Sequence, residues 1–313
     1  MRRAVIVGCG GQDGRLLFDL LRDKGYALTG LDVRRRRCAR CRGGGPVDIR
    51  NAGQVERLIR RFRPHEVYYL AARHRSAEGR DAESAALLRD SYEIHVLGLL
   101  RFLDAMRVFS PRTRLFYASS SLVFGTRRGG RFDERSPLRP DEIYGITKAQ
   151  GMALCRFYRR RHRLFTASGI LFNHESPLRG ESFVSRRIVR GAVEVKKGHR
   201  RAVVLGDLRA QADWGWAPDY VEAMRRILRA PQPEDFIVAT GKKHSVGEFA
   251  RRVCARLGLD PEKHLHIDQR RLTRRTGARV GDAGRLRRRT GWKPTVDFPG
   301  MVDRLLAAEL KAS

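Results

Sequence analysis

The sequence has no long hydrophobic run, few acidic residues and only scattered cysteines, and each shortage excludes a class of protein. No apolar stretch reaches the roughly 20 residues that a membrane-spanning helix needs, which argues against a membrane protein. The opening "MRRAVIVGCGG" leads from a short apolar run into a glycine turn rather than a cleavage site, unlike a signal peptide. We therefore expect a cytoplasmic protein with no membrane partner.

Cysteine is scarce as well, with five residues at positions 9, 38, 41, 155 and 254. This odd, scattered set is unlike the paired cysteines of a disulfide-stabilised secreted domain. Cys38 and Cys41 form a C-x-x-C pair, but a structural zinc site needs four ligands and the sequence offers no second pair. The sequence therefore predicts neither a disulfide framework nor a bound metal.

Acidic residues are outnumbered, because 34 Asp and Glu stand against 65 Lys and Arg and give a net charge of +31. Such a charge is typical of nucleic-acid-binding proteins. However, the basic clusters at 34–37, 159–161 and 287–289 lack the interleaved aromatic residues that stack on bases. No helix-turn-helix, RRM or zinc-finger pattern is present either. The charge is therefore interpreted as favouring a small anionic substrate and attracting phosphates, with no nucleic-acid partner.

Apolar strand patterns alternate with amphipathic helix patterns through the first half of the 313 residues. Strand-like runs at 27–33, 66–72 and 114–124 are separated by helix-like stretches, of which 90–108 is the longest. This alternation predicts an α/β fold with a Rossmann-type doubly wound parallel sheet. From about residue 173 the pattern loosens. We predict a Rossmann domain over 1–172 and a smaller, mainly substrate-binding lobe over 173–313, with some segments returning to the Rossmann core.

Three glycines, Gly8, Gly11 and Gly14, lie between the first strand pattern and the first helix pattern. Glycine there permits a tight turn and lets backbone amides approach a pyrophosphate, which then faces the helix N-terminus. The position of the glycines predicts a dinucleotide site.

The residues after the second strand pattern bear on which dinucleotide binds. Asp32 ends that strand, where a carboxylate can accept hydrogen bonds from the adenosine ribose hydroxyls, as NAD requires. Arg34 and Arg35 follow at once and can bind a 2′-phosphate, as NADP requires. We expect NAD and leave NADP open. Asp48 and Ile49 are expected to meet the adenine edge.

The segment "YGITK" places Tyr144 and Lys148 four residues apart, on one face of a predicted helix. A lysine ammonium near a phenol favours the phenolate, so Tyr144 is expected to act as a general base or acid with a lowered pKa. Ser120, at the end of a strand pattern, is expected to hydrogen-bond the same substrate hydroxyl. Ser120, Tyr144 and Lys148 together predict hydride transfer between an alcohol carbon and a nicotinamide.

With these motifs in place, the chain resembles the extended short-chain dehydrogenase/reductases, the NAD-dependent epimerase/dehydratase family, and within it the GDP-mannose 4,6-dehydratases. The similarity runs nearly end to end. It includes "GGQDG" at the turn, "LAA" at 70–72 and "GILFNHESPLRGESFVSRRI" at 169–188. It continues with "DWG" at 213–215, "DYVEAM" at 219–224, "EDFIVATG" at 234–241 and "GWKP" at 291–294. The resemblance implies a nucleotide-diphosphate sugar as substrate.

The turn, the strand ends and the resemblance together give two sets of expected contacts. The cofactor is expected to meet Gly8, Gly11, Gln12, Asp13, Gly14, Asp32, Arg34, Asp48, Ile49, Leu70, Ala71, Ala72, Tyr144, Lys148, Leu171, Asn173, His174 and Arg179. The substrate is expected to meet Ser120, Ser121, Asn173, Val184, Arg187 and Arg274. Arginine suits this role because a guanidinium pairs well with a diphosphate.

One departure from the family decides the predicted reaction. These dehydratases place a glutamate two positions after the catalytic Ser or Thr, and this chain has Leu122 there. Because loss of a general acid or base costs about 10²–10⁴-fold in rate, oxidation at C4 should survive while elimination of water fails. Return of the hydride to the opposite face would give a nucleotide-sugar 4-epimerase, our leading prediction. A 4-ketosugar reductase, or a 4,6-dehydratase with a relocated acid such as Glu175, remain alternatives.

Other departures bear on the substrate and on assembly. Ala212 replaces a family arginine for the diphosphate, and Gly277 lies nearest the place of a nucleotide-binding glutamate. The base and the sugar therefore stay open. His95 replaces the asparagine of a "V-N-x-x-G" helix motif and is assigned no chemical role. The loop after the second strand is shorter than in the tetrameric members of the family, so we expect a homodimer through the two long helices.

Overall fold

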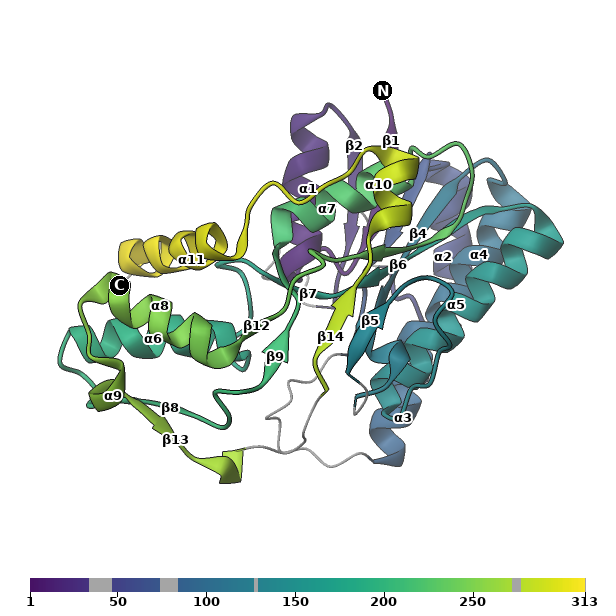
Figure 1. Ribbon diagram of the computed structural model, residues 1–313. Coiled ribbons are helices and arrows are strands. Elements are labelled where there is room, and N and C mark those ends of the chain that lie inside the picture. Colours follow the sequence, from purple (N-terminus) through teal and green to yellow (C-terminus); the bar gives the residue numbers. More distant parts are fainter. Residues whose placement is uncertain (34–46, 74–83, 127–128, 272–276, 313) are drawn as a thin grey trace.

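The computed structural model describes residues 1–33, 47–73, 84–126, 129–271 and 277–312, and a six-stranded parallel sheet forms its centre (Figure 1). The strand order is β11-β6-β4-β3-β1-β2. The strands are β1 (Arg3–Val7), β2 (Ala27–Leu31), β3 (Glu66–Tyr69), β4 (Arg114–Ser120), β6 (Phe165–Leu171) and β11 (Asp235–Val238). Every neighbouring pair is parallel, which confirms the predicted Rossmann-type sheet.

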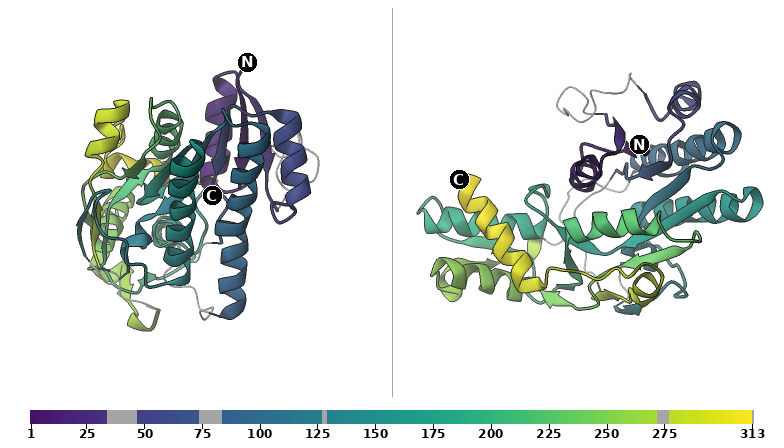
Figure 2. Two further views of the ribbon diagram at one scale, coloured as in Figure 1. Left: turned by 90° about the vertical axis from the view of Figure 1, so that its right-hand side faces the viewer. Right: turned by 90° about the horizontal axis from the view of Figure 1, so that it is seen from above.

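Helices cover both faces of this sheet, as Figures 1 and 2 show. Alternate residues of β1 separate the two faces: Ala4 and Ile6 pack in one hydrophobic cluster, Val5 and Val7 in the other. The first cluster includes residues of α1 (Gln12–Asp23), α7 (Ala217–Ile227) and α10 (Gly284–Thr290). The second includes residues of α2 (Ala52–Phe62), α4 (Gly98–Phe109) and α5 (Ile143–His162). Burial on both faces explains why these strands read as continuous apolar runs.

The helix expected over 90–108 forms, but it is not α-helical throughout. It consists of α3 (Ala85–Tyr92), a π-helical segment η3 (Glu93–Leu97) and then α4. The wider turn of η3 leaves backbone carbonyls for other donors: the Tyr69 hydroxyl donates to the carbonyl of Ile94 at 2.5 Å. Gly98 follows the wide turn, and a Cβ there would lie 2.4 Å from the Tyr69 oxygen.

A third hydrophobic cluster lies away from the central sheet and is built by α6 (Val184–Lys196), α8 (Val246–Leu257) and α11 (Phe298–Ala312) (Figure 1). The smaller elements are β5 (Gly130–Phe132), β7 (Asn173–Glu175), β8 (Val203–Leu205), β9 (Gln211–Ala212), β10 (Trp214–Trp216), β12 (His244–Ser245), α9 (Pro261–His264), β13 (Leu265–Ile267), η5 (Gln269–Arg271) and β14 (Arg279–Gly281). They pair as β7 with β10, β9 with β12, β8 with β13 and β5 with β14. The proposed division at residue 172 stays a prediction.

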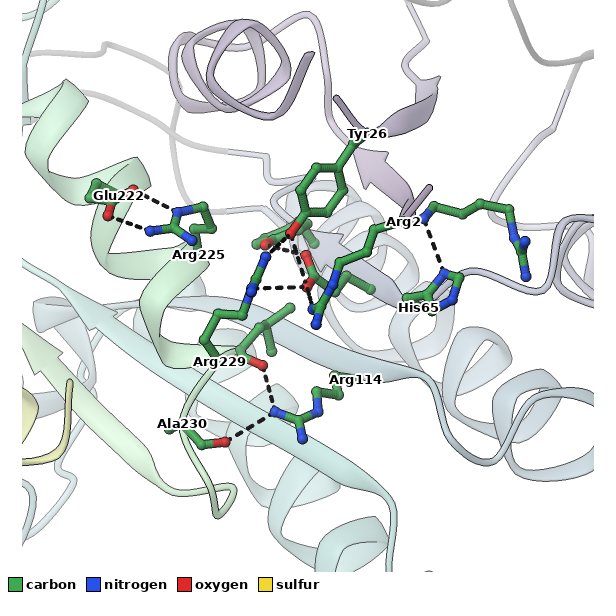
Figure 3. A network of polar contacts seen from close by, with 12 residues as sticks. Arg2, Tyr26, His65, Arg114, Glu222, Arg225, Arg229 and Ala230 are labelled. Atoms are coloured by element: carbon green, nitrogen blue, oxygen red, sulfur yellow. Dashed lines mark hydrogen bonds and ion pairs between the residues drawn. The ribbon is translucent and has the colours of Figure 1, made fainter. Parts of the chain in front are cut away.

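A buried carboxylate, Glu66, lies at the amino edge of the sheet, where Arg2, Tyr26 and Arg229 converge (Figure 3). Its side chain is 1% exposed. The Tyr68 hydroxyl donates to it at 2.8 Å, the Tyr26 hydroxyl at 3.3 Å and the Arg2 guanidinium at 3.1 Å. These partners satisfy the carboxylate and join the first strand to the end of α7.

Two further findings bear on the predictions from composition. Cys9 is disulfide-bonded, whereas Cys155 and Cys254 are buried free thiols. Across the described ranges, every helix is too short or too polar to span a bilayer.

Candidate active site

The carboxyl end of β4 supplies the first predicted catalytic residue. Ser120 ends the strand, opposite Leu171 of β6, and its Oγ accepts a hydrogen bond from the Leu122 amide at 3.2 Å. That bond caps the short 3₁₀-helix η4 (Ser121–Phe124) and fixes the serine oxygen at the strand end. Because the hydroxyl accepts here, its own proton is available for a ligand.

The first turns of α5 bring Tyr144 and Lys148 to the same strand end. The approach depends on Gly145, where a Cβ would lie 2.6 Å from the carbonyl oxygen of Leu122. The Lys148 ammonium donates to the carbonyl of Ala118 at 2.8 Å and lies 5.6 Å from the centre of the Tyr144 ring. Lys148 is 1% exposed. The serine, tyrosine and lysine that the sequence singled out are therefore held by neighbouring segments at one edge of the sheet.

Burial governs the protonation of this pair. Burial raises the pKa of Tyr144, and the positive charge of Arg179 opposes the rise without cancelling it. Burial also lowers the pKa of Lys148 to about 7. In the chain without a cofactor, burial therefore keeps the pKa of Tyr144 high, and the expectation that Lys148 and a positively charged nicotinamide together lower it stays a prediction.

The glycine turn has the close backbone packing that a dinucleotide site needs. Gly8 has a φ of +90°, and a Cβ there would lie 2.8 Å from the Ala71 amide nitrogen. A Cβ on Gly14 would lie 2.1 Å from the Gly8 carbonyl oxygen. The Gly10 amide donates to the Asp32 carboxylate at 2.9 Å, which ties the turn to the end of β2. The turn opens directly into α1, so the residues present fit a pyrophosphate at a helix N-terminus.

Several predicted cofactor side chains bind one another. The ring of His174 lies with Nε2 2.9 Å from an Asp13 carboxylate oxygen and Nδ1 2.7 Å from the carbonyl of Phe172. The Gln12 amide donates to Asp13 and to the carbonyl of His174. Burial opposes the charges on both partners, but their mutual attraction prevails, so the pKa of Asp13 is lowered and that of His174 raised. This group fastens α1 to β7.

The predicted adenine-edge residues have protein partners too. Asp48 forms a two-pronged ion pair with Arg50, which lowers the pKa of the carboxyl, and the carbonyl of Ile49 accepts from Arg101. The segment Leu70–Ala72 follows β3 and passes directly beside Gly8. Its placement brings these backbone groups next to the glycine turn.

The remaining predicted residues lie on β7 and at the start of α6. Asn173 is exposed and pairs with Trp214, while Arg179 lies 3.6 Å from the centre of the Phe183 ring. Val184 begins α6, and Arg187 lies on its first turn; both are half-buried. Ser121 is buried in η4. The predicted contacts Arg34 and Arg274, with Arg35, Cys38 and Cys41, lie outside the described residues.

The site offers no acid at the family's position. Leu122 is 8% exposed and lies in the 3₁₀-helix that Ser120 caps. The suggested substitute, Glu175, is 2% exposed; its carboxylate accepts a 2.5 Å hydrogen bond from Ser185 and lies 3.4 Å from Arg179. Both contacts involve Oε2 and hold the buried carboxylate against Ser185 and Arg179, and its role as the relocated acid stays a prediction.

His95, to which no chemical role was assigned from the sequence, lies beside Tyr144. The two rings meet edge to face with centres 5.4 Å apart. A lone histidine in an apolar helix pattern carries no signal of such a contact, since only the fold brings 95 and 144 together. No group of His, Cys, Asp and Glu within the described segments is arranged to hold a metal ion.

The chain matches a known protein family over nearly its whole length. The family model for GDP-mannose 4,6 dehydratase matches residues 5–305. GDP-mannose 4,6 dehydratase 2 of Arabidopsis thaliana is 34% identical over 330 residues, covering 98% of this chain and 87% of that protein.

Two solved structures share the fold over 99% of this chain. RMD from Pseudomonas aeruginosa, solved with NADPH, has a TM-score of 0.81 at 21% identity and is covered completely. The UDP-glucose 4-epimerase of Thermus thermophilus, solved with NAD, has a TM-score of 0.80 at 24% identity and is covered to 99%. With the resemblance thus confirmed, the chain belongs to the GDP-mannose 4,6-dehydratase family of extended short-chain dehydrogenase/reductases.

Proposed function

We propose that the protein oxidises C4 of a nucleotide-diphosphate sugar with a bound nicotinamide cofactor, with NAD as the first candidate and NADP still open. The observation that carries the proposal is the placement of Ser120 at the carboxyl end of β4, against which the first turns of α5 hold Tyr144 and buried Lys148. The glycine turn beside Leu70–Ala72 supports the cofactor assignment. Family membership supports a sugar nucleotide, and GDP-mannose is the substrate to test first.

The chain's own residues divide the work at C4. Ser120 donates its proton to the oxygen on C4, and Tyr144 takes the proton that the C4 hydroxyl loses. When bound, the nicotinamide supplies a hydride acceptor. Tyr144 by itself holds its proton, because burial raises its pKa. Positive charge close to the phenol favours the phenolate, and the ammonium form of Lys148 is placed to provide it.

For the net reaction, family membership and the names of the relatives favour 4,6-dehydration over the epimerisation that the sequence alone put first. Elimination needs a base for the C5 proton and an acid for the C6 hydroxyl. Leu122 provides neither, and Glu175 is buried against Ser185 and Arg179. We therefore propose a dehydratase that oxidises C4 normally but eliminates water slowly. Its elimination step is about 10²–10⁴-fold slower than it would be with an acid at position 122.

Epimerisation at C4 is the second candidate, and the buried leucine at 122 is the observation that favours it. A 4-keto intermediate that does not eliminate can take the hydride back on its other face. A 4-ketosugar reductase would use the same three residues but would consume reduced cofactor with each turnover.

The test is to incubate the purified protein with GDP-mannose and a panel of other nucleotide sugars and to determine product mass and cofactor balance. Loss of one water supports dehydration, and unchanged mass with a new retention time supports epimerisation. Stoichiometric consumption of reduced cofactor with a 4-keto substrate supports the reductase. If neither the parent protein nor Tyr144→Phe converts any of the nucleotide sugars, the proposal is refuted.

Leu122→Glu sharpens this test. It is expected to raise the rate of water loss at least 10-fold without changing the rate of C4 oxidation, because it adds only the missing proton carrier. Leu122→Gln is the matched control, since it has a similar size but cannot transfer the proton as a carboxylate does.

We also propose a homodimer through α4 and α5. Val108 and Phe157 on these helices are 55% and 54% exposed. Large apolar side chains exposed to this extent are typical of a surface that another protein subunit covers. Light scattering on a sizing column would measure the mass, and a charge at Phe157 should release monomer.

A further inference from the structure

A fully buried histidine that the proposed reaction does not use lies against the catalytic tyrosine. His95 is 0% exposed, and its ring meets that of Tyr144 at an interplanar angle of 88°. An edge-to-face contact of this kind is favourable and has a preferred geometry, so it restricts how the phenol ring turns.

The two ring nitrogens of His95 reach two segments of the site. Nε2 accepts from the backbone amide of Arg73 at 2.9 Å, directly after the Leu70–Ala72 segment beside the glycine turn. Since a backbone amide only donates, Nε2 carries no proton, and the ring proton is on Nδ1. Nδ1 lies 2.8 Å from Thr147 Oγ1, to which it donates. The neutral ring therefore bridges the cofactor-side loop and the catalytic helix.

Thr147 carries the connection to Tyr144. Its hydroxyl lies 2.9 Å from the carbonyl of Ile143 and 3.2 Å from that of Tyr144, so its proton closes the first turn of α5. The chain of hydrogen bonds runs from the Arg73 amide through the ring and the threonine to the backbone that holds Tyr144.

The histidine itself sits on a fixed support. It lies in the π-helical segment η3, and its own carbonyl accepts from the Tyr117 hydroxyl at 3.3 Å. The carbonyl before it accepts from Tyr69. The ring of Tyr117 also lies 5.0 Å from the Lys148 ammonium. The same strand residue thus contacts both the support of His95 and the catalytic lysine.

From this geometry we infer that His95 is a positioning residue for Tyr144: through Thr147 and the ring contact it sets the tyrosine relative to Lys148 and the cofactor-side loop. The inference rests on the proposed role of Tyr144 as the proton acceptor. His95 does not exchange protons in this role, because both nitrogens are used in the neutral tautomer.

The test compares His95→Phe, which keeps the ring and loses both hydrogen bonds, with Thr147→Val, which keeps shape and loses the hydroxyl. Each is expected to lower kcat about 10–100-fold while KM for the sugar nucleotide changes less than about 3-fold, since misplacing a catalytic group costs rate more than binding. The double variant is expected to be no worse than His95→Phe, because both changes break one connection.

Thr166→Val is the matched control. Thr166 is also fully buried and its hydroxyl also donates to a carbonyl of α5, that of Cys155 at 2.7 Å, but at a point remote in sequence from Tyr144. It is expected to leave kcat unchanged. An unchanged kcat in His95→Phe, or an equal loss in Thr166→Val, would overturn the inference. If His95→Phe does not fold, Thr147→Val decides by the same criteria.

A readout without turnover separates this inference from the proposed function. Nitrogen NMR of histidine-labelled protein, assigned with His95→Phe, is expected to show a neutral ring protonated on Nδ1 and a shifted signal in Thr147→Val. A ring that titrates like an exposed imidazole would refute the connection even in an active enzyme. If the parent converts no nucleotide sugar, the proposed function fails, and the NMR result alone still decides whether the bridge exists.

Discussion

Glu66 and Lys148 are buried to the same depth near opposite edges of the central sheet, but their surroundings differ. Glu66 is surrounded by two arginines and two tyrosine hydroxyls (Figure 3). Lys148 has one backbone carbonyl and the faces of two tyrosine rings, and no described carboxylate pairs with it. Its pKa falls to about 7, within reach of a change of charge at neutral pH.

The comparison separates structural charges from functional ones. A buried charge surrounded by donors or acceptors gains little from changing its protonation, and it joins the elements that supply its partners. A buried charge without a counter-ion costs stability, and such groups cluster at functional sites. The amino edge of this sheet holds the first kind of charge, and the carboxyl edge the second.

The largest expected effect separates activity from stability at Lys148. Lys148→Met should lower kcat about 10²–10⁴-fold, because the ammonium near Tyr144 is lost. The free energy of unfolding should not fall, because an uncompensated buried charge is removed while the side-chain volume stays similar. Steady-state kinetics and urea unfolding measure the two. A variant that unfolds more easily than the parent would contradict the claim that the buried Lys148 charge costs stability.

The converse is expected at Glu66. Glu66→Leu should lower the free energy of unfolding by about 3 kcal/mol, because the buried Tyr68 hydroxyl loses its acceptor. The value of kcat should stay unchanged well below the unfolding transition. Glu66→Gln, whose amide oxygen still accepts from the tyrosine, should lose less. A loss of kcat in a folded Glu66→Leu protein would contradict a purely structural role.

The lysine also predicts how stability depends on pH. Its folded pKa of about 7 lies below its unfolded value of 10.5, so between these values the unfolded chain binds the extra proton and stability rises with pH. The stability advantage of Lys148→Met over the parent should therefore shrink by about 2 kcal/mol between pH 7 and pH 9. Urea unfolding of both proteins at the two pH values measures it. An advantage that grows with pH would refute the assigned shift.

The smallest effect is expected at Arg2, the more exposed of the two arginines beside Glu66. Arg2 is 47% exposed in its side chain, so Arg2→Met should cost about 1 kcal/mol or less in unfolding free energy. The remaining partners, Arg229, Tyr26 and Tyr68, keep the carboxylate satisfied. A cost as large as that of Glu66→Leu would show that the carboxylate depends on one ion pair rather than on the set.

The sequence was sufficient for those features that depend on local pattern. The glycine turn, the alternation of strands and helices, and the four-residue spacing of Tyr144 and Lys148 each follow from short-range geometry, and parallel strands bring Ser120 to the same edge. What depends on depth or long-range pairing was not predictable. The direction of the Tyr144 pKa shift depends on burial, Asp13 pairs with the distant His174, and His95 meets Tyr144 only in three dimensions.

The π-helical turn at 93–97 has a consequence for helical phase. Each residue of an α-helix advances by about 100°, so one extra residue in a turn rotates everything after it by that amount relative to everything before. Leu99, Phe102, Leu103 and Met106 are all buried, whereas α3 buries only Ser91. A single-residue deletion within 93–97 would keep a helix but rotate the part after the deletion by about 100° relative to the part before it. Either the apolar face of α4 would then turn away from the core, or His95 would turn away from Tyr144. The length of this segment is therefore as constrained as its composition.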